Sequence, residues 1–315
     1  MAKSRSCHQK SNHERQTRLT TMANLITVFT PTYNRGGFLY DIFESLSQQT
    51  FKDFEWIVVD DGSTDNTKDM MDKIITGFHS FPIGYIYKEN GGKHTAINVG
   101  TKLAKGELFF IVDSDDTLMD TALWTVADEW NKLKDNPQNG GVVGLDVNSK
   151  TGEIIGGGLP QDVIDCDAME IRYRHHVSGD LKEVFRTDVL RKFPFPEIKG
   201  ECFCPEQLVW FRIAQKYKLR YIKKPIYKVK YQPDGITSSI VKARMESPVA
   251  TCMTYGEMLE YPIPLIQKVK AAINYWRFRC CLQTVPPQVP RVKCCWRIFR
   301  PMGYMMHIKD RKVIR

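Results

Sequence analysis

A chain of 315 residues is long enough to bury a substantial core and to form one large domain or two modest ones. Its hydrophobic content of 42% and charged content of 26% are typical of globular proteins, and no apolar run is long enough to cross a bilayer. The net charge of +9 is uneven: residues 261–315 carry +11 and the rest of the chain −2. A positive charge confined to one tail argues against nucleic acid as the partner of the whole protein.

The nine cysteines predict free thiols. Their number is odd, the start of the chain lacks a signal-peptide apolar core, and no Asn-x-Ser/Thr sequon is present. None of the closely spaced cysteines has the Cys-x-x-Cys spacing of a zinc knuckle. We therefore expect a reducing, cytoplasmic location.

The first 22 residues are polar and basic, without hydrophobic periodicity, and predict a disordered N-terminal extension. Met22 directly precedes the first predicted strand, so 1–21 are a candidate for an extension ahead of the native start. A β-branched strand is predicted at 25–29, followed by a turn-rich loop at 30–37 and an amphipathic helix at 38–46.

Strands and helices alternate up to residue 112. Strands are predicted at 56–59, 83–87 and 108–112, with helices near 66–75 and 93–104 between them. This alternation is typical of a doubly wound α/β protein with a mainly parallel sheet. A Gly-x-Gly-x-x-Gly motif after the first strand and a P-loop are both missing from the sequence, which argues against a dinucleotide enzyme or a P-loop NTPase.

The strand at 108–112 ends in three carboxylates, those of Asp113, Asp115 and Asp116. Carboxylates this close repel one another unless a cation neutralises them, so the cluster indicates a divalent metal site. The carboxyl edge of a parallel sheet is also where α/β proteins bind ligands. The alternative is a solvated acidic turn, in which Asp is an ordinary residue.

Beyond residue 116 the pattern is less regular. A helix is predicted at 123–130 and strands at 142–147, 183–186, 221–222 and 226–229, whereas 152–177 is Gly-rich and irregular. Pro205 suits the start of a helix that continues to residue 214. The turn at 234–237 is a candidate to close over a bound ligand.

The motifs of residues 26–231 resemble, in order and spacing, those of the family 2 glycosyltransferases. The matching segments are 30–35, 47–51, 59–65, 90–92, 96–100, 105–107 and 112–116. The resemblance implies an inverting enzyme with the GT-A fold, which is Rossmann-like with a mainly parallel central sheet and helices on both faces. It divides the chain into a GT-A domain at 23–240 and a basic, helical C-terminal extension at 241–315. Within the domain, 23–120 would bind the nucleotide sugar and 121–240 the acceptor.

The resemblance also implies a nucleoside diphosphate sugar over the carboxyl ends of the first strands. Pro31 and Tyr33 would wall the base, and Asp61 would accept a hydrogen bond from a base N–H, which favours uracil. The residues assigned to the nucleotide sugar are Pro31, Tyr33, Arg35, Asp61, Lys93, Asp113, Ser114 and Asp115. For Lys93 the alternative is a solvated lysine at a helix start.

Asp113-Ser114-Asp115 matches the Asp-x-Asp motif of the family. Asp113 would hold the ribose and, directly or through water, the metal. Asp115 would be the direct ligand of a Mn²⁺ or Mg²⁺ ion that offsets charge on the departing diphosphate. Asp116 would either assist or cap the following helix.

An inverting transfer needs one base to deprotonate the acceptor hydroxyl. In the family this carboxylate opens a helix, and Glu206 takes that position, with Pro205 replacing the usual preceding Glu. Glu201 is the rival base, and a first-turn Glu is also favoured by the helix dipole alone. Trp210 either stacks on a sugar or belongs to the core.

The sequence therefore predicts an inverting, metal-dependent glycosyltransferase acting from a UDP-sugar on a glycan or lipid-linked acceptor, in cell-surface polysaccharide synthesis. The alternatives are a catalytically inactive nucleotide-sugar-binding protein and a sugar nucleotidyltransferase. The basic segment 261–315 mixes apolar and cationic residues, which is typical of a helix on an anionic membrane, here the inner face of the plasma membrane. Its alternatives are a helix packed on the catalytic domain and, less favoured, a nucleic-acid arm.

Overall fold

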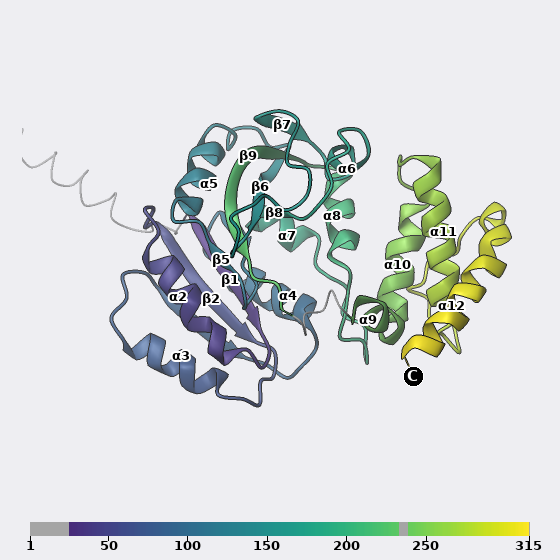
Figure 1. Cartoon of the computed structure of the whole chain (residues 1–315), viewed down its shortest axis with the longest axis horizontal. Coiled ribbons are helices and arrows are strands. Elements are labelled where there is room, and N and C mark those ends of the chain that lie inside the picture. Colours follow the sequence, from purple (N-terminus) through teal and green to yellow (C-terminus); the bar gives the residue numbers. More distant parts are fainter. Residues whose placement is uncertain (1–24, 233–238, 315) are drawn as a thin grey trace, which may run out of the picture.

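The computed structural model describes residues 25–232 and 239–314. The predicted extension at 1–22 and the predicted turn at 234–237 lie outside the described residues. A sheet domain carries the first part of the chain, and a helical unit at its side carries the last part (Figure 1). No helix in either described range combines the length and the apolar character needed to cross a membrane.

The first half of the sheet is parallel, as predicted. Strand β1 pairs with β2 on one side and β4 on the other, and β2 pairs with β3. The elements of this half are β1 (Ile26–Thr32), η1 (Gly36–Phe38), α2 (Leu39–Ser47), β2 (Phe54–Asp60), α3 (Thr67–Thr76), β3 (Ile83–Tyr87), α4 (Lys93–Leu103) and β4 (Leu108–Ile111). The carboxyl ends of β1, β2 and β4 therefore meet at one edge of the sheet.

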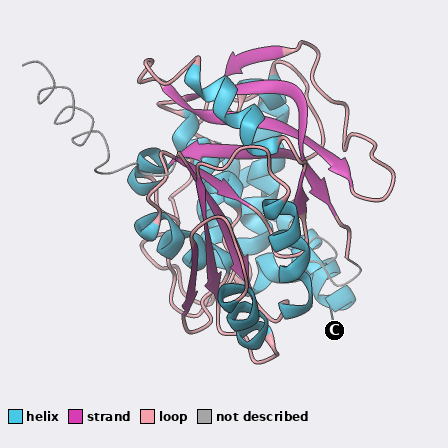
Figure 2. Ribbon diagram, turned by 90° about the vertical axis from the view of Figure 1, so that its left-hand side faces the viewer, coloured by secondary structure: helices cyan, strands magenta, loops and turns pink. Residues whose placement is uncertain are grey.

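Helices cover both faces of this sheet (Figure 2). Successive side chains of a strand point to opposite faces, so Val28 and Phe110 pack with α2 and α3, whereas Phe29 and Phe109 pack with α4. Both pairs of side chains are fully buried. The near-continuous apolar character of these strands is the consequence of burial on two faces.

The second half of the sheet is mixed. Strand β8 inserts antiparallel between β4 and β6, and the order along the sheet is β3-β2-β1-β4-β8-β6-β9-β5, with β7 pairing on β9. The elements here are β5 (Thr117–Leu118), α5 (Ala122–Asn131), β6 (Asn139–Asn148), β7 (Val163–Cys166), α6 (Glu170–Tyr173), β8 (Leu181–Arg186), α7 (Thr187–Lys192), α8 (Glu206–Ala214) and β9 (Lys218–Val229). The predicted α/β architecture, mainly parallel with helices on both faces, is thus confirmed.

Three local predictions were wrong. Strand β1 continues through Pro31 to Thr32 and stays paired with β2. On its other side β4 pairs only as far as Phe29, so no carbonyl of β4 is left without a donor because Pro31 lacks an N–H. The stretch 152–177 contains β7 and α6. The two strands predicted at 221–222 and 226–229 are one irregular strand, β9, whose pairing with β6 shifts register near Pro225.

The helical unit packs against the sheet domain through α10. Its elements are α9 (Ile240–Glu246), α10 (Pro248–Met258), α11 (Leu265–Arg279), η3 (Cys294–Phe299) and α12 (Arg300–Ile314). Helix α10 is buried along most of its length and shares one hydrophobic core with α8. An ion pair of 2.6 Å between Arg212 and Glu257 joins the same two helices. Helix α12 lies on the side of this unit that faces away from the sheet (Figure 1).

Candidate active site

A cavity of about 550 Å³ opens at the carboxyl edge of the sheet. All nine residues predicted for the site line it: Pro31, Tyr33, Arg35, Asp61, Lys93, Asp113, Ser114, Asp115 and Glu206. They come from the end of β1, from the loops after β1, β2 and β4, and from the first turns of α4 and α8. The topology thus brings together residues that the sequence spreads over both halves of the domain.

The loop after β1 is tied to the loop after β2. Asn34 adopts a left-handed backbone conformation (φ +52°), which its short polar side chain tolerates. Its side-chain oxygen accepts the backbone N–H of Thr64 at 2.7 Å, and its own N–H donates to the Ser63 hydroxyl at 2.8 Å. These bonds fix the chain next to Tyr33, whose ring remains half exposed at the cavity wall.

Asp61 holds the segment that leads into α4. Its buried carboxylate accepts the backbone N–H of Gly91 at 3.0 Å and of Gly92 at 2.7 Å, and it pairs with the Lys88 ammonium. Gly92 has φ +92°, and a Cβ there would lie 1.9 Å from the Cys202 carbonyl oxygen, so only glycine is accommodated. Because one Asp61 oxygen accepts a single bond, it keeps a lone pair for a further donor.

Lys93 bridges two carboxylates across the cavity. Its ammonium lies 2.6 Å from Asp113 Oδ1 and 2.9 Å from Glu206 Oε1. Burial opposes the charged form of Lys93, but these two carboxylates outweigh it and raise the Lys93 pKa. Burial likewise opposes ionisation of Asp113, and Lys93 and Lys182 outweigh it and lower the Asp113 pKa. Lys93 is therefore part of the cavity's charge network and not a solvated helix-start lysine.

The other acids of the cluster are crowded. Burial, with the Asp113 charge second, raises the pKa of Asp115 and raises that of Asp116 to about 6. Asp116 accepts the backbone N–H of Lys230 at 2.7 Å and so anchors the segment after β9. It does not cap the following helix α5, which begins at Ala122.

The carboxylates suit a cation that a ligand helps to hold. Within the described part of the chain, no three acidic, histidine or cysteine side chains are grouped closely enough to hold a metal ion by themselves. Mg²⁺ and related ions bind through one or two carboxylates completed by substrate phosphates and water. Asp113 and Asp115 would fit that donor set. Burial is the main cause of the raised Asp115 pKa, and a cation would offset the second cause, the negative charge of Asp113.

Several cavity residues were not foreseen. Lys182 on β8 lies 3.7 Å from Asp113 and 3.8 Å from the centre of the Tyr227 ring, and the Tyr227 hydroxyl accepts the Asp113 backbone N–H at 2.9 Å. Asp146 on β6 is 3% exposed, and its Oδ1 has no hydrogen-bond partner among the residues that the structure describes. Lys182, Tyr227 and Asp146 lie on strands of the mixed half of the sheet, and no sequence motif predicts how those strands pair.

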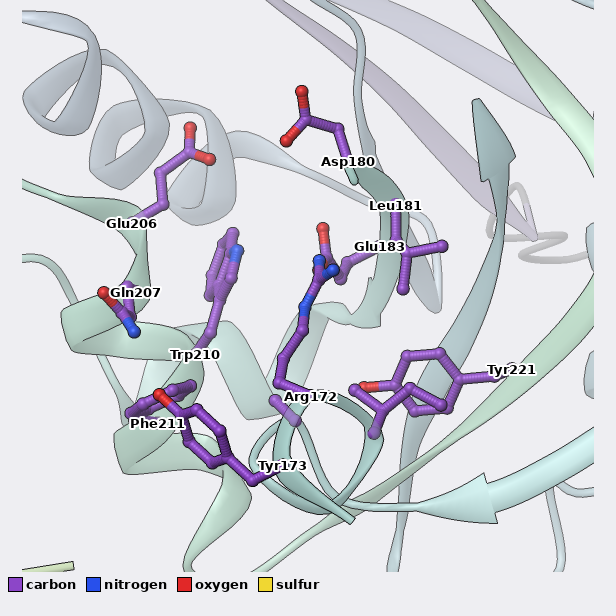
Figure 3. Close-up of a pocket in the computed structure, with 12 residues that line it drawn as sticks. Arg172, Tyr173, Asp180, Leu181, Glu183, Glu206, Gln207, Trp210, Phe211 and Tyr221 are labelled. Atoms are coloured by element: carbon purple, nitrogen blue, oxygen red, sulfur yellow. The ribbon is translucent and has the colours of Figure 1, made fainter. Parts of the chain in front are cut away.

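Figure 3 shows a second cavity, of about 400 Å³. It adjoins the first, because the two have lining residues in common. The two share Asp180, Leu181, Glu183 and Glu206. The second is also lined by Ala168, Ile171, Arg172, Tyr173, Gln207, Trp210, Phe211 and Tyr221. Trp210 packs against the rings of Phe185 and Phe195, so it belongs to the core while one part of it lines the cavity. Glu206 is therefore common to both cavities.

Glu201, the rival base, lines neither cavity. It is 8% exposed, and its two oxygens accept the backbone N–H groups of Val249 at 2.6 Å and Ala250 at 2.9 Å. These N–H groups open α10 and have no partner within the helix. Glu201 therefore stabilises a helix start, and of the two candidate bases it is Glu206 that lines the cavities.

The fold is that of the GT-A glycosyltransferases. Similar solved structures include S. aureus TarS 1-349 in complex with UDP-GlcNAc, with a TM-score of 0.59, 19% identity and 91% of each chain covered. A mannosyltransferase, PcManGT from Pyrobaculum calidifontis in complex with GDP-Man and Mn²⁺, aligns with a TM-score of 0.56 and 16% identity, covering 96% of this chain and 94% of that one. These likenesses confirm the predicted fold class.

Sequence comparison defines the family. Residues 27–142 match the model of glycosyl transferase family 2. The chain is 30% identical over 220 residues, 67% of each protein, to the GalNAc(5)-diNAcBac-PP-undecaprenol beta-1,3-glucosyltransferase of Campylobacter jejuni. It is 39% identical over 106 residues to glycosyltransferase GlyG of Streptococcus pneumoniae, a match that spans 33% of this chain and 35% of that one. The chain belongs to glycosyltransferase family 2, and it spans about a third of the length of GlyG.

Proposed function

We propose that this protein is an inverting, metal-dependent glycosyltransferase that moves a sugar from a UDP-sugar to a hydroxyl of a glycan or lipid-linked acceptor. One observation carries the proposal: the carboxylates of Asp113, Asp115 and Glu206 line one cavity, and Lys93 connects Asp113 to Glu206. The diphosphate of the donor would bind beside Asp113 and Asp115, and the attacking hydroxyl of the acceptor would lie beside Glu206.

The donor half of the cavity has the parts that a nucleotide needs. The exposed face of Tyr33 offers stacking for a base, and Asp61 offers an acceptor on a carboxylate that its other hydrogen bonds hold still. An acceptor recognises the N–H of uracil. The structurally similar TarS 1-349 was solved in complex with UDP-GlcNAc, which supports a UDP-sugar as the donor.

Asp113 and Asp115 are the residues that would hold Mn²⁺ or Mg²⁺. The ion supplies Lewis-acid stabilisation of the charge that develops on the leaving diphosphate. The structurally similar PcManGT is a complex with GDP-Man and Mn²⁺, which supports this assignment. Lys93 and Lys182, at 2.6 and 3.7 Å from Asp113, place two further positive charges where the same phosphates would lie.

Glu206 is the proposed general base. It stands at the boundary between the two cavities, so its carboxylate reaches a hydroxyl that approaches from the second cavity toward a donor in the first. Such an attack comes from the side opposite the diphosphate, which is the geometry of inversion. Release of Glu206 from Lys93, 2.9 Å away, frees its oxygens to accept the proton.

The second cavity is the proposed acceptor site. Figure 3 shows Trp210 and Arg172 reaching into it from different elements, with Glu206 and Asp180 at one end. Aromatic faces beside carboxylate and amide groups suit a sugar ring, whose apolar face stacks while its hydroxyls form hydrogen bonds. The name of the Campylobacter jejuni relative, which specifies an undecaprenol-linked acceptor, supports a lipid-linked glycan and a role in cell-surface polysaccharide synthesis.

The deciding experiment is calorimetry and turnover with the full chain. We expect UDP-GlcNAc or another UDP-sugar to bind only with Mn²⁺ or Mg²⁺, and to be hydrolysed or transferred with release of UDP. Binding without any turnover would instead support an inactive nucleotide-sugar-binding protein. Release of pyrophosphate would support a nucleotidyltransferase. Failure of every nucleotide sugar to bind would overturn the proposal.

A further inference from the structure

Helix α12 is attached to the rest of the protein along one side. Gly303 and His307 are buried against α11, and a Cβ at Gly303 would lie within 2.8 Å of the α11 backbone. One turn further on, Asp310 accepts two hydrogen bonds from the Arg277 guanidinium. These contacts fix which side of α12 points outward.

The outward side of α12 and the preceding turn is apolar. Its large exposed apolar side chains recur at intervals of three and four residues, and they are Ile298, Met302, Tyr304, Met305, Met306 and Ile308. Ile298 is 73% and Met305 is 64% exposed. Exposed apolar side chains gathered at this spacing on one short helical segment, unlike single scattered ones, mark an interaction surface. We call these residues the α12 face.

The same helical segment is cationic. Residues 294–314 contain five cations, Arg297, Arg300, Lys309, Arg311 and Lys312. Their one acid, Asp310, is already paired with Arg277. The helical unit as a whole, residues 239–314, has thirteen Lys and Arg residues against four acids.

We propose that the α12 face lies on an anionic lipid surface, with its apolar side chains in the headgroup boundary and its cations on the phosphates. An amphipathic helix with Lys and Arg beside exposed apolar side chains has this binding mode. The positive charge of this segment favours anionic lipid over a second copy of the chain as the partner of the α12 face. A second copy of the chain, in a two-fold contact through this face, would bring cations against cations, whereas anionic lipid complements them. The inference uses residues outside both cavities and does not depend on the proposed catalytic function.

The test is co-sedimentation of the full chain with vesicles. The chain should bind vesicles of phosphatidylcholine mixed with about one third phosphatidylglycerol, should bind pure phosphatidylcholine far less, and should dissociate as salt is raised. Replacement of Lys309, Arg311 and Lys312 by Gln should weaken binding about a hundredfold, from about fivefold per cation. Met302→Ser with Met305→Ser should weaken it at least tenfold.

Matched controls lie on the sheet domain. Lys68, Lys73 and Lys102 are exposed, and their replacement by Gln removes the same net charge from another surface. Phe78→Ser removes an apolar side chain that is 96% exposed. Both controls should keep vesicle binding, and all variants should keep the wild-type unfolding midpoint. Equal loss in variants and controls would overturn the proposal. The proposal would also be overturned if the wild-type chain did not bind the anionic vesicles, for example because it dimerises through Met302 and Met305 instead.

Discussion

The Lys93 ammonium lies 2.9 Å from the Glu206 carboxylate and 2.6 Å from that of Asp113, so one cation links the proposed base to the proposed metal ligand. A divalent ion and a diphosphate would carry charges that compete with both contacts. The Lys93 ammonium therefore lies at the electrostatic position that donor and metal would take together. This relationship makes the charge of the cavity depend on whether the donor is bound.

Lys93→Gln tests this competition. Removal of the ammonium leaves the Asp113 carboxylate with Lys182 as its nearest cation, so Mn²⁺ alone should bind about tenfold more tightly, as measured by calorimetry without donor. Sugar transfer should fall, because a positive charge near the leaving diphosphate is lost. Lys102→Gln, at the exposed end of the same helix, should change neither quantity. Weaker Mn²⁺ binding in K93Q would contradict the competition.

Asp115→Asn tests the metal site. The substitution keeps the size of the side chain and removes its charge, so donor binding in the presence of Mn²⁺ should weaken about a hundredfold. The calorimetric signal should then no longer distinguish solutions with and without the ion. Asp135→Asn, outside the cavity, is the control. Unchanged Mn²⁺-dependent donor binding in D115N would remove Asp115 from the metal site.

Glu206→Gln and Glu201→Gln should fail in different ways. E206Q should bind the UDP-sugar as the wild type does and lose transfer by roughly 10²- to 10⁴-fold, because only proton abstraction is impaired. E201Q should keep transfer at low temperature and lose about 1 to 2 kcal/mol of stability, because the carboxylate accepts two N–H groups at the start of α10. Loss of transfer in E201Q with an unchanged unfolding midpoint would reverse the assignment.

Gln207→Leu tests the second cavity. Gln207 lines that cavity and not the first, so its loss should raise the KM for the acceptor about fivefold while leaving donor binding unchanged. Hydrolysis of the donor, in which water replaces the acceptor, should proceed as in the wild type. An altered donor affinity with an unaltered acceptor KM would place the acceptor elsewhere.

The site residues that could be predicted from the sequence are those that follow the parallel strands. Asp61 and Asp113 come one and two residues after the ends of β2 and β4. The carboxyl ends of parallel strands in one sheet lie at the same edge, whatever the sequence between the strands. Lys88 directly follows β3, the neighbour of β2, so the same rule would have predicted that Lys88 lies near Asp61.

Lys182 and Tyr227 could not be predicted in this way. Lys182 reaches Asp113 because β8 runs antiparallel between β4 and β6, and Tyr227 does so from β9, the neighbour of β6. Pairing between distant strands depends on long-range packing and not on a local motif. The choice between Glu201 and Glu206 depended on tertiary structure too, because the helix start that Glu201 caps lies in α10, more than forty residues further along the chain.

Asp146→Asn tests the electrostatics of the buried edge of the cavity. Burial raises the pKa of Asp146 to about 7, helped by Asp180, Asp116 and Asp113 and opposed by Lys182. Between the ordinary value of 3.8 and about 7, the folded protein binds more protons at this group than the unfolded chain does. The contribution of Asp146 to the free energy of unfolding therefore falls as pH rises through this window, and above it the group destabilises the fold.

D146N removes that titration together with a buried carboxylate whose Oδ1 has no hydrogen-bond partner in the described parts of the chain. At pH 8 the variant should be more stable than the wild type by about 1 to 3 kcal/mol, and near pH 4 the two should be similar. Urea unfolding at several pH values measures the difference. Asp128→Asn, on a partly exposed side chain of α5 that pairs with Lys132, should leave the pH profile of the wild type unchanged. A D146N profile parallel to that of the wild type would show that Asp146 keeps its ordinary pKa in the folded protein, with Lys182 offsetting its burial.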